Sequence, residues 1–103
     1  MGSCVVIAVE NCPKEILEEY ARNIKQESKN YERKGRKAEA IIGGLEASVV
    51  EKDGKMAIVL KVGANILPVY LGTVARIIEK TFIKFAEEKG YKVKTEVFHF
   101  SNV

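Results

Sequence analysis

Four basic residues stand close together in the stretch NYERKGRKAE. Arg33, Lys34, Arg36 and Lys37 fill four of five consecutive positions. Clustered lysine and arginine side chains neutralise phosphates without reading base sequence, so the cluster predicts a contact with the backbone of RNA or DNA. The alternative interpretation is a hydrated connection between two elements, because charged side chains are mostly exposed. The choice between a nucleic-acid contact and a hydrated connection depends on the secondary-structure elements on either side of the cluster.

Two other side chains have the chemistry of catalytic groups. Cys12 stands just before an expected helix, where the helix N-terminus lowers the pKa of a thiol. His99 is the single histidine. Cys12 has no histidine nearby and no second cysteine at CxxC spacing. We therefore interpret Cys12 as a capping or packing residue and His99 as a structural or exposed one, and an enzyme with Cys12 as its nucleophile is our third hypothesis.

Sites for metals and phosphates leave recognisable sequence patterns, and these are absent here. The adjacent acids Glu18-Glu19 and Glu87-Glu88 are typical of solvated helix faces. Gly43-Gly44 falls inside an expected strand, and the sequence has no GxxxxGK[ST] motif. We therefore predict no metal ligands, no cofactor, no catalytic residues and no enzymatic activity.

The composition is that of one globular domain covering residues 1–103. Hydrophobic residues make up 47% of the chain and charged residues 30%, and a net charge of +3 permits a nucleic-acid partner without requiring one. No apolar run reaches the length of a membrane helix and no signal peptide is visible. The two cysteines cannot bridge within one strand, which favours a reducing, cytoplasmic compartment. The abundance of lysine and glutamate leans towards a thermophile.

Hydrophobic periodicity predicts four strands and two helices. A helix of about four turns begins near Pro13, a residue suited to the first helical position, and ends near Gly35. Gly43-Gly44 marks a bulge, since the apolar residues change parity there. The other predicted elements are strands over residues 3–10, 38–50, 55–62 and 91–100 and a helix over residues 69–88.

The pairing of the middle two strands can be deduced from their side chains. With Asp53-Gly54 as a two-residue loop, Glu46 lies opposite Lys61, an attractive pair. The same register places apolar residues on one face, in the pairs Leu45–Val62, Ala47–Leu60 and Val49–Ile58. Repulsion between Lys52 and Lys55 at the tip favours a looser turn.

The element order βαββαβ predicts an α+β fold of the ferredoxin-like type, an antiparallel sheet with both helices on one face. RRM domains share this order and stack RNA bases on aromatic residues of their two central strands. The corresponding strands here, CVVIAVE and KMAIVLKV, contain no aromatic residue. If the chain is an autonomous nucleic-acid-binding module, it therefore binds the phosphate backbone through the basic cluster.

The sheet face away from the helices is predicted to be aliphatic. If the residues of even number in 56–62 face the helices, Ala57 and Val59 face outwards. An exposed aliphatic face of this size is normally covered, so we predict dimerisation through it. The alternative is a terminal segment, residues 98–103, folded over the face. Tyr70 and Ile77 form an apolar shoulder on the second helix, which predicts a second partner contact there.

Two stretches resemble the small dimerising subunits of the KEOPS complex, a family that includes the LAGE and CTAG antigens. VENCPKEILEEYARNIKQE is similar to the first strand and helix of that family, and GKMAIVLKVGANILPVYLGTVARIIEKTF to its second hairpin strand and the helix that follows. The resemblance covers most of the chain up to about Glu88. The family's Arg-Ser pair has no clean match, although Arg36-Lys37 falls nearby, and the strand over residues 91–100 is an addition.

This resemblance implies a non-catalytic accessory subunit of the complex that makes threonylcarbamoyladenosine in tRNA. Such a subunit forms a homodimer, or a heterodimer with a paralogue, and docks a larger tRNA-modification subunit. A contact with tRNA is also implied, and no membrane is involved. The departures from the family pattern suit a divergent paralogue that keeps the dimer-forming scaffold and loses part of the RNA contact, and they equally suit an unrelated ferredoxin-like domain.

Overall fold

The computed structural model describes residues 2–34, 45–62 and 68–101. The predicted bulge at Gly43-Gly44 and the first part of its strand lie outside these residues. The elements are β1 (Ser3–Glu10), α1 (Lys14–Lys34), β2 (Leu45–Lys52), β3 (Lys55–Val62), α3 (Pro68–Glu88) and β4 (Lys94–Ser101).

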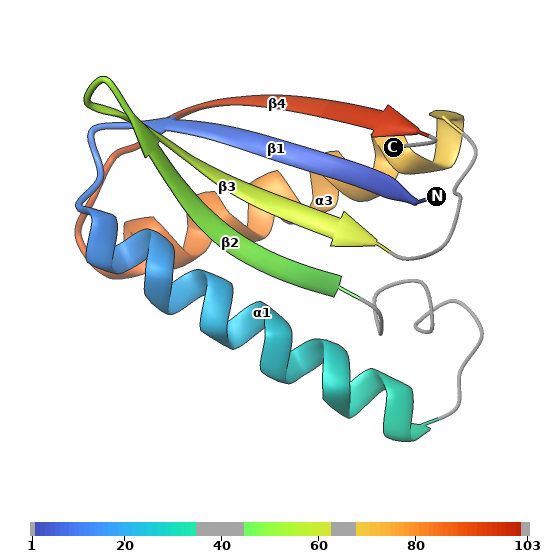
Figure 1. Cartoon of the computed structure of the whole chain (residues 1–103). Coiled ribbons are helices and arrows are strands. Elements are labelled where there is room, and N and C mark those ends of the chain that lie inside the picture. Colours follow the sequence, from blue (N-terminus) through green and yellow to red (C-terminus); the bar gives the residue numbers. More distant parts are fainter. Residues whose placement is uncertain (1, 35–44, 63–67, 102–103) are drawn as a thin grey trace.

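The four strands form one antiparallel sheet in the order β2-β3-β1-β4. Strands β1 and β3 are therefore central, and β2 and β4 are the edges. Figure 1 shows α1 and α3 on the same side of this sheet, with no other described element over the opposite side. The predicted ferredoxin-like βαββαβ fold is confirmed.

Helix α1 forms because an amphipathic sequence follows residues that favour a helix N-terminus. The amide of Ile16 donates to the carbonyl of Pro13, and Glu15 supplies a negative charge near the positive end of the helix dipole. The helix is 21 residues long, so it is longer than the four turns predicted. Its described stripe packs on the sheet through the buried residues Leu17, Tyr20, Ala21 and Ile24.

The hairpin between β2 and β3 has the predicted register. Glu46 lies opposite Lys61, and the apolar pairs Ala47–Leu60 and Val49–Ile58 fall on the face that packs into the core. The expectation of a looser turn was wrong, because Lys52 still pairs with Lys55. Asp53 and Gly54 have φ values of 54° and 76°, the conformation of a tight hairpin turn whose twist matches the strands. This fit of the backbone outweighs the repulsion between two exposed lysines.

The end of α3 explains why β4 begins later than predicted. Gly90 has a φ of 92°, its amide donates to the carbonyl of Glu87, and the amide of Tyr91 donates to Ala86. This pair of hydrogen bonds is the Schellman motif that satisfies carbonyls at a helix end. Tyr91 therefore completes the helix terminus, and the strand starts only at Lys94.

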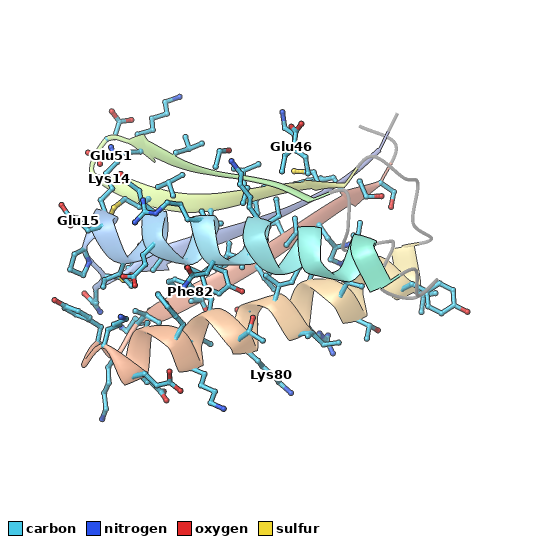
Figure 2. The ribbon with its side chains drawn as sticks, turned by 90° about the horizontal axis from the view of Figure 1, so that it is seen from below. Lys14, Glu15, Glu46, Glu51, Lys80 and Phe82 are labelled. Atoms are coloured by element: carbon cyan, nitrogen blue, oxygen red, sulfur yellow. The ribbon has the colours of Figure 1, made fainter. Side chains whose placement is uncertain are left out.

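The core lies between the sheet and the two helices. Tyr20 of α1 connects the helices: its hydroxyl lies 2.6 Å from that of Thr81 and donates to the carbonyl of Ile78, while its ring meets Phe82 edge-on. Figure 2 shows Phe82 between the two helices. The largest fully buried side chains are Phe82, Ile7, Leu17, Ile58, Leu60, Leu71 and Val5.

The alternative in which residues 98–103 fold over the outer face is wrong for the described part of that segment. Phe98 and Phe100 belong to β4, where they pair with Val6 and Cys4 of β1. The backbone hydrogen bonds of a fourth strand hold this segment in the plane of the sheet. It therefore extends the outer face and does not cover it.

Candidate functional site

The sheet face opposite the helices, which we call the open face, has an apolar centre. Its register places Val59 of β3 beside Val6 of β1, and Val6 beside Phe98 of β4. In the next row, Ala57 lies beside Ala8. The apolar side chains of the open face are Cys4, Val6, Ala8, Val50, Ala57, Val59, Phe98 and Phe100.

The open face is exposed to a degree that the covered face is not. Ile58 and Leu60 of β3 are 0% exposed against the helices. On the open face, Val50 is 48%, Phe98 42% and Phe100 50% exposed. A contiguous apolar patch on a sheet is a recurring mark of a protein–protein interface. The predicted outward direction of Ala57 and Val59 agrees with the structure.

The sequence-based reasoning missed the two phenylalanines of the open face. The alternation of side chains along β4 could have indicated them. Val97 packs towards α3, so Phe98 and Phe100 face away from the helices. The central strands β1 and β3 have no aromatic residue on this face, as predicted. The aromatic residues of this face stand instead on the edge strand β4, and not on the two central strands that would correspond to the base-stacking strands of RRM domains.

Charges of both signs border the apolar centre. At one end, Glu46 lies opposite Lys61. At the other end, Glu10 pairs with Lys94 across β1 and β4, and the Lys52–Lys55 pair closes the hairpin. The rim therefore carries both signs, with three lysines and one glutamate at the hairpin end and one of each sign at the other end.

A second apolar surface lies on α3. Val69, Tyr70 and Ile77 are 72%, 62% and 56% exposed. Tyr70 and Ile77 share a helical stripe with Thr81, whose hydroxyl contacts Tyr20 of α1, so this flank of α3 faces the neighbouring helix. A cleft of about 270 Å³ opens between the helices farther along α3, with Tyr20, Thr81 and Phe85 among its walls, and Tyr70 and Ile77 are not among the described residues that line it.

The four predicted interface residues therefore belong to two separate surfaces. Ala57 and Val59 lie on the open face of the sheet, and Tyr70 and Ile77 lie in the helix layer on the other side. The structure does not bring them together into one site. It offers two surfaces that point in different directions.

The basic cluster is described only in part. Arg33 and Lys34 are the last two residues of α1, and Arg36 and Lys37 lie outside the described residues. Roughly three turns before this end of the helix, Arg22 and Lys25 are exposed beside β2. A cleft of about 320 Å³ runs there between α1 and β2, lined also by Lys14, Glu18 and Ser48.

The structure opposes the hypothesis that Cys12 is a nucleophile. Cys12 is only 6% exposed, and burial raises the pKa of its thiol. A nucleophilic cysteine needs access and a lowered pKa, because the thiolate is the reactive form. Burial also raises the pKa of Cys4, and the positive charge of Lys61 partly offsets that effect.

His99 lies in a cleft of about 430 Å³ between α3 and β4, together with Arg76 and Thr73. A Cβ atom placed on Gly72 would stand 3.4 Å from its Nε2, so the glycine gives the imidazole room against the helix. Among the described residues that line this cleft, there is neither a carboxylate nor a thiol that could form a catalytic pair with the histidine.

Within residues 2–34, 45–62 and 68–101, no three His, Cys, Asp or Glu side chains gather as metal ligands would. No helix in the same residues is long and apolar enough to cross a membrane.

No protein-family model matches the sequence, and no curated protein matches it. Among solved structures, the chain is similar to the de novo designed protein Foldit4, with a TM-score of 0.49 and 12% identity over 95% of this chain and 97% of that one. It is also similar to the de novo designed protein LFR1 1 with ferredoxin fold, with a TM-score of 0.47 and 14% identity over 100% and 86% of the two chains. These likenesses concern the fold alone.

Proposed function

We propose that this protein is a non-catalytic accessory subunit that joins two partners. One partner covers the open face of the sheet and makes a dimer. The other, a larger protein, docks on the flank of α3 that carries Tyr70 and Ile77. The observation that supports this proposal is the presence of two exposed apolar surfaces on opposite layers of one small domain.

The resemblance to the small dimerising subunits of the KEOPS complex names the larger assembly in this proposal. The larger partner is then a subunit of the cytoplasmic machinery that makes threonylcarbamoyladenosine in tRNA. The stretch GKMAIVLKVGANILPVYLGTVARIIEKTF contains β3 and α3 as far as Phe82, and it supplies residues of both proposed surfaces. The dimer partner in this assembly is either a second copy or a paralogue.

Affinity purification of the tagged protein from its own cells, followed by mass spectrometry, tests the proposal. We expect a tRNA-modification ATPase to co-purify with the unmodified chain. The double variant Tyr70→Ser, Ile77→Ser should lose that partner and keep its dimer. Co-purification of a different assembly, with no tRNA-modification protein, would contradict the assignment.

A second candidate function is binding of an RNA or DNA backbone, and exposed Arg22 and Lys25 in the middle of α1 favour it. They lie roughly two to three turns before the predicted cluster of Arg33, Lys34, Arg36 and Lys37, whose first two residues belong to the same helix. Neutralising those four residues to glutamine should weaken binding and flatten its dependence on salt. The matched control loses the same net charge elsewhere, through glutamine at Lys52, Lys55, Lys80 and Lys84. Equal loss in both variants would reject a specific site.

A further inference from the structure

We propose that the partner on the open face is a second copy of this same chain, packed face to face with Phe98 and Phe100 as the anchoring side chains. This inference rests on the proposed function, because it identifies the dimer partner that the function leaves open between a copy and a paralogue.

The charges around the open face favour a copy of itself. Glu46 stands beside Lys61 at one end, and Glu10 stands beside Lys94 at the other. A surface whose rim carries a single sign repels its own copy, whereas a rim with both signs lets each charge of one copy find an opposite charge on the other. With Glu96 beside Phe98, three carboxylates stand against the four lysines Lys52, Lys55, Lys61 and Lys94 on this face, so it has no strong excess of positive charge for a phosphate backbone.

The distribution of large and small side chains over the open face also suits self-association. Large side chains gather on the edge strand β4, where Phe98 and Phe100 are about half exposed. Small ones, Ala8 and Ala57, pair in the two central strands and leave a low area. Buried aromatic anchors that fill a depression in the partner supply much of the binding energy in protein interfaces.

The area of the open face is sufficient for a weak but specific dimer. The sheet has four strands of eight residues each. Strands about 4.8 Å apart with a rise of about 3.3 Å per residue give a face of roughly 500 Å². Two copies then bury roughly 1,000 Å² in total, the lower bound for a specific interface. We therefore expect dissociation in the micromolar range.

Cys4 is a built-in reporter of this interface, because it lies on the open face between Lys61 and Phe100. A dimer through this face covers its thiol, whereas Cys12 is buried in the core of each copy. We would measure the rate at which N-ethylmaleimide modifies Cys4, by intact mass, on the purified full chain from about 1 to about 100 µM.

The expected result is a Cys4 rate at least about fivefold slower at the high concentration, in parallel with a dimeric mass. Phe98→Ser should abolish this protection, with Phe100→Ser as the second variant if the first does not fold, and Tyr70→Ser should retain it. A dimeric mass with a constant Cys4 rate would overturn this inference and leave the dimeric subunit standing. A monomer that pairs only with a paralogue would overturn the inference, and a monomer with no partner at all would overturn the proposed function too.

Discussion

The two faces of the sheet are built from similar residues and meet different surroundings. On β3, Ile58 and Leu60 are 0% exposed beneath the helices, while their neighbour Val59 points to the open side. The alternation of side chains along a strand makes neighbouring residues serve opposite faces. Hydrophobic character alone therefore does not separate core from interface. The difference is whether other residues of the same chain pack over the side chain.

The first prediction uses adjacent residues on opposite faces. Ile58→Ala should reduce the free energy of unfolding by about 3 kcal/mol, because it leaves a cavity in a packed core. Val59→Ala should cost at most about 1 kcal/mol in the monomer, since its side chain is already partly in water. Urea unfolding of dilute protein measures both. Equal losses would show that the open face is covered within the monomer.

The second prediction concerns the hydrogen bonds of Tyr20, which connect the two helices that cover one face of the sheet. Tyr20→Phe removes the hydroxyl that reaches Thr81 and the carbonyl of Ile78. We expect a loss of about 1 to 2 kcal/mol of unfolding free energy, because partly buried acceptors lose a donor. Tyr70→Phe is the control: its exposed hydroxyl should contribute nothing measurable in urea unfolding. A comparable loss in both variants would contradict the role of Tyr20.

The third prediction concerns an ion pair at the rim of the helix layer. Lys89 reaches Glu19 at 3.2 Å, and both side chains are substantially exposed. Glu19→Gln should change the free energy of unfolding by less than about 0.5 kcal/mol, because water screens such pairs. Thermal unfolding at low and high salt checks this. A loss near that of Tyr20→Phe would mean that surface charge, and not packing, holds the two helices together.

The fourth prediction concerns the thiol of the open face, and its expected effect is the smallest. The charge of Lys61 counteracts the burial that raises the pKa of Cys4. Lys61→Gln should raise that pKa further, so that less thiolate is present at pH 8 and alkylation of dilute monomer slows. The control, Lys55→Gln at the other end of the open face, should leave the rate unchanged. Faster alkylation in Lys61→Gln would contradict the assigned cause.

Much of the fold could be predicted from side-chain patterning. The register of the hairpin followed from the Glu46–Lys61 pair and the shared parity of the apolar residues, because a slip by one residue would reverse every side chain. The two-residue loop at Asp53-Gly54, on which that register was based, is present, and only the counter-argument from the repulsion of Lys52 and Lys55 was wrong. The late start of β4 was missed because Tyr91 completes a helix terminus, a three-dimensional arrangement.

The candidate site was predicted only in part. The outward direction of Ala57 and Val59 follows from the period of a strand, and it agreed with the structure. Phe98 and Phe100 lie beside Val6 and Cys4 on the open face because β4 pairs with β1. The alternation of side chains along β4 does not by itself predict that pairing. The separation of Tyr70 and Ile77 from the open face follows from the layering of helices on one side of the sheet. The identity of a partner depends on surfaces outside this chain.

The central claim, that a second copy covers the open face, is tested most directly by the mass of the protein in solution. Sedimentation equilibrium of the unmodified chain from about 1 to about 100 µM should show a mass rising from 11.5 kDa towards twice that value. In the same experiment Phe98→Ser should stay at the lower mass. A constant mass of 11.5 kDa for the unmodified chain at every concentration would contradict the claim.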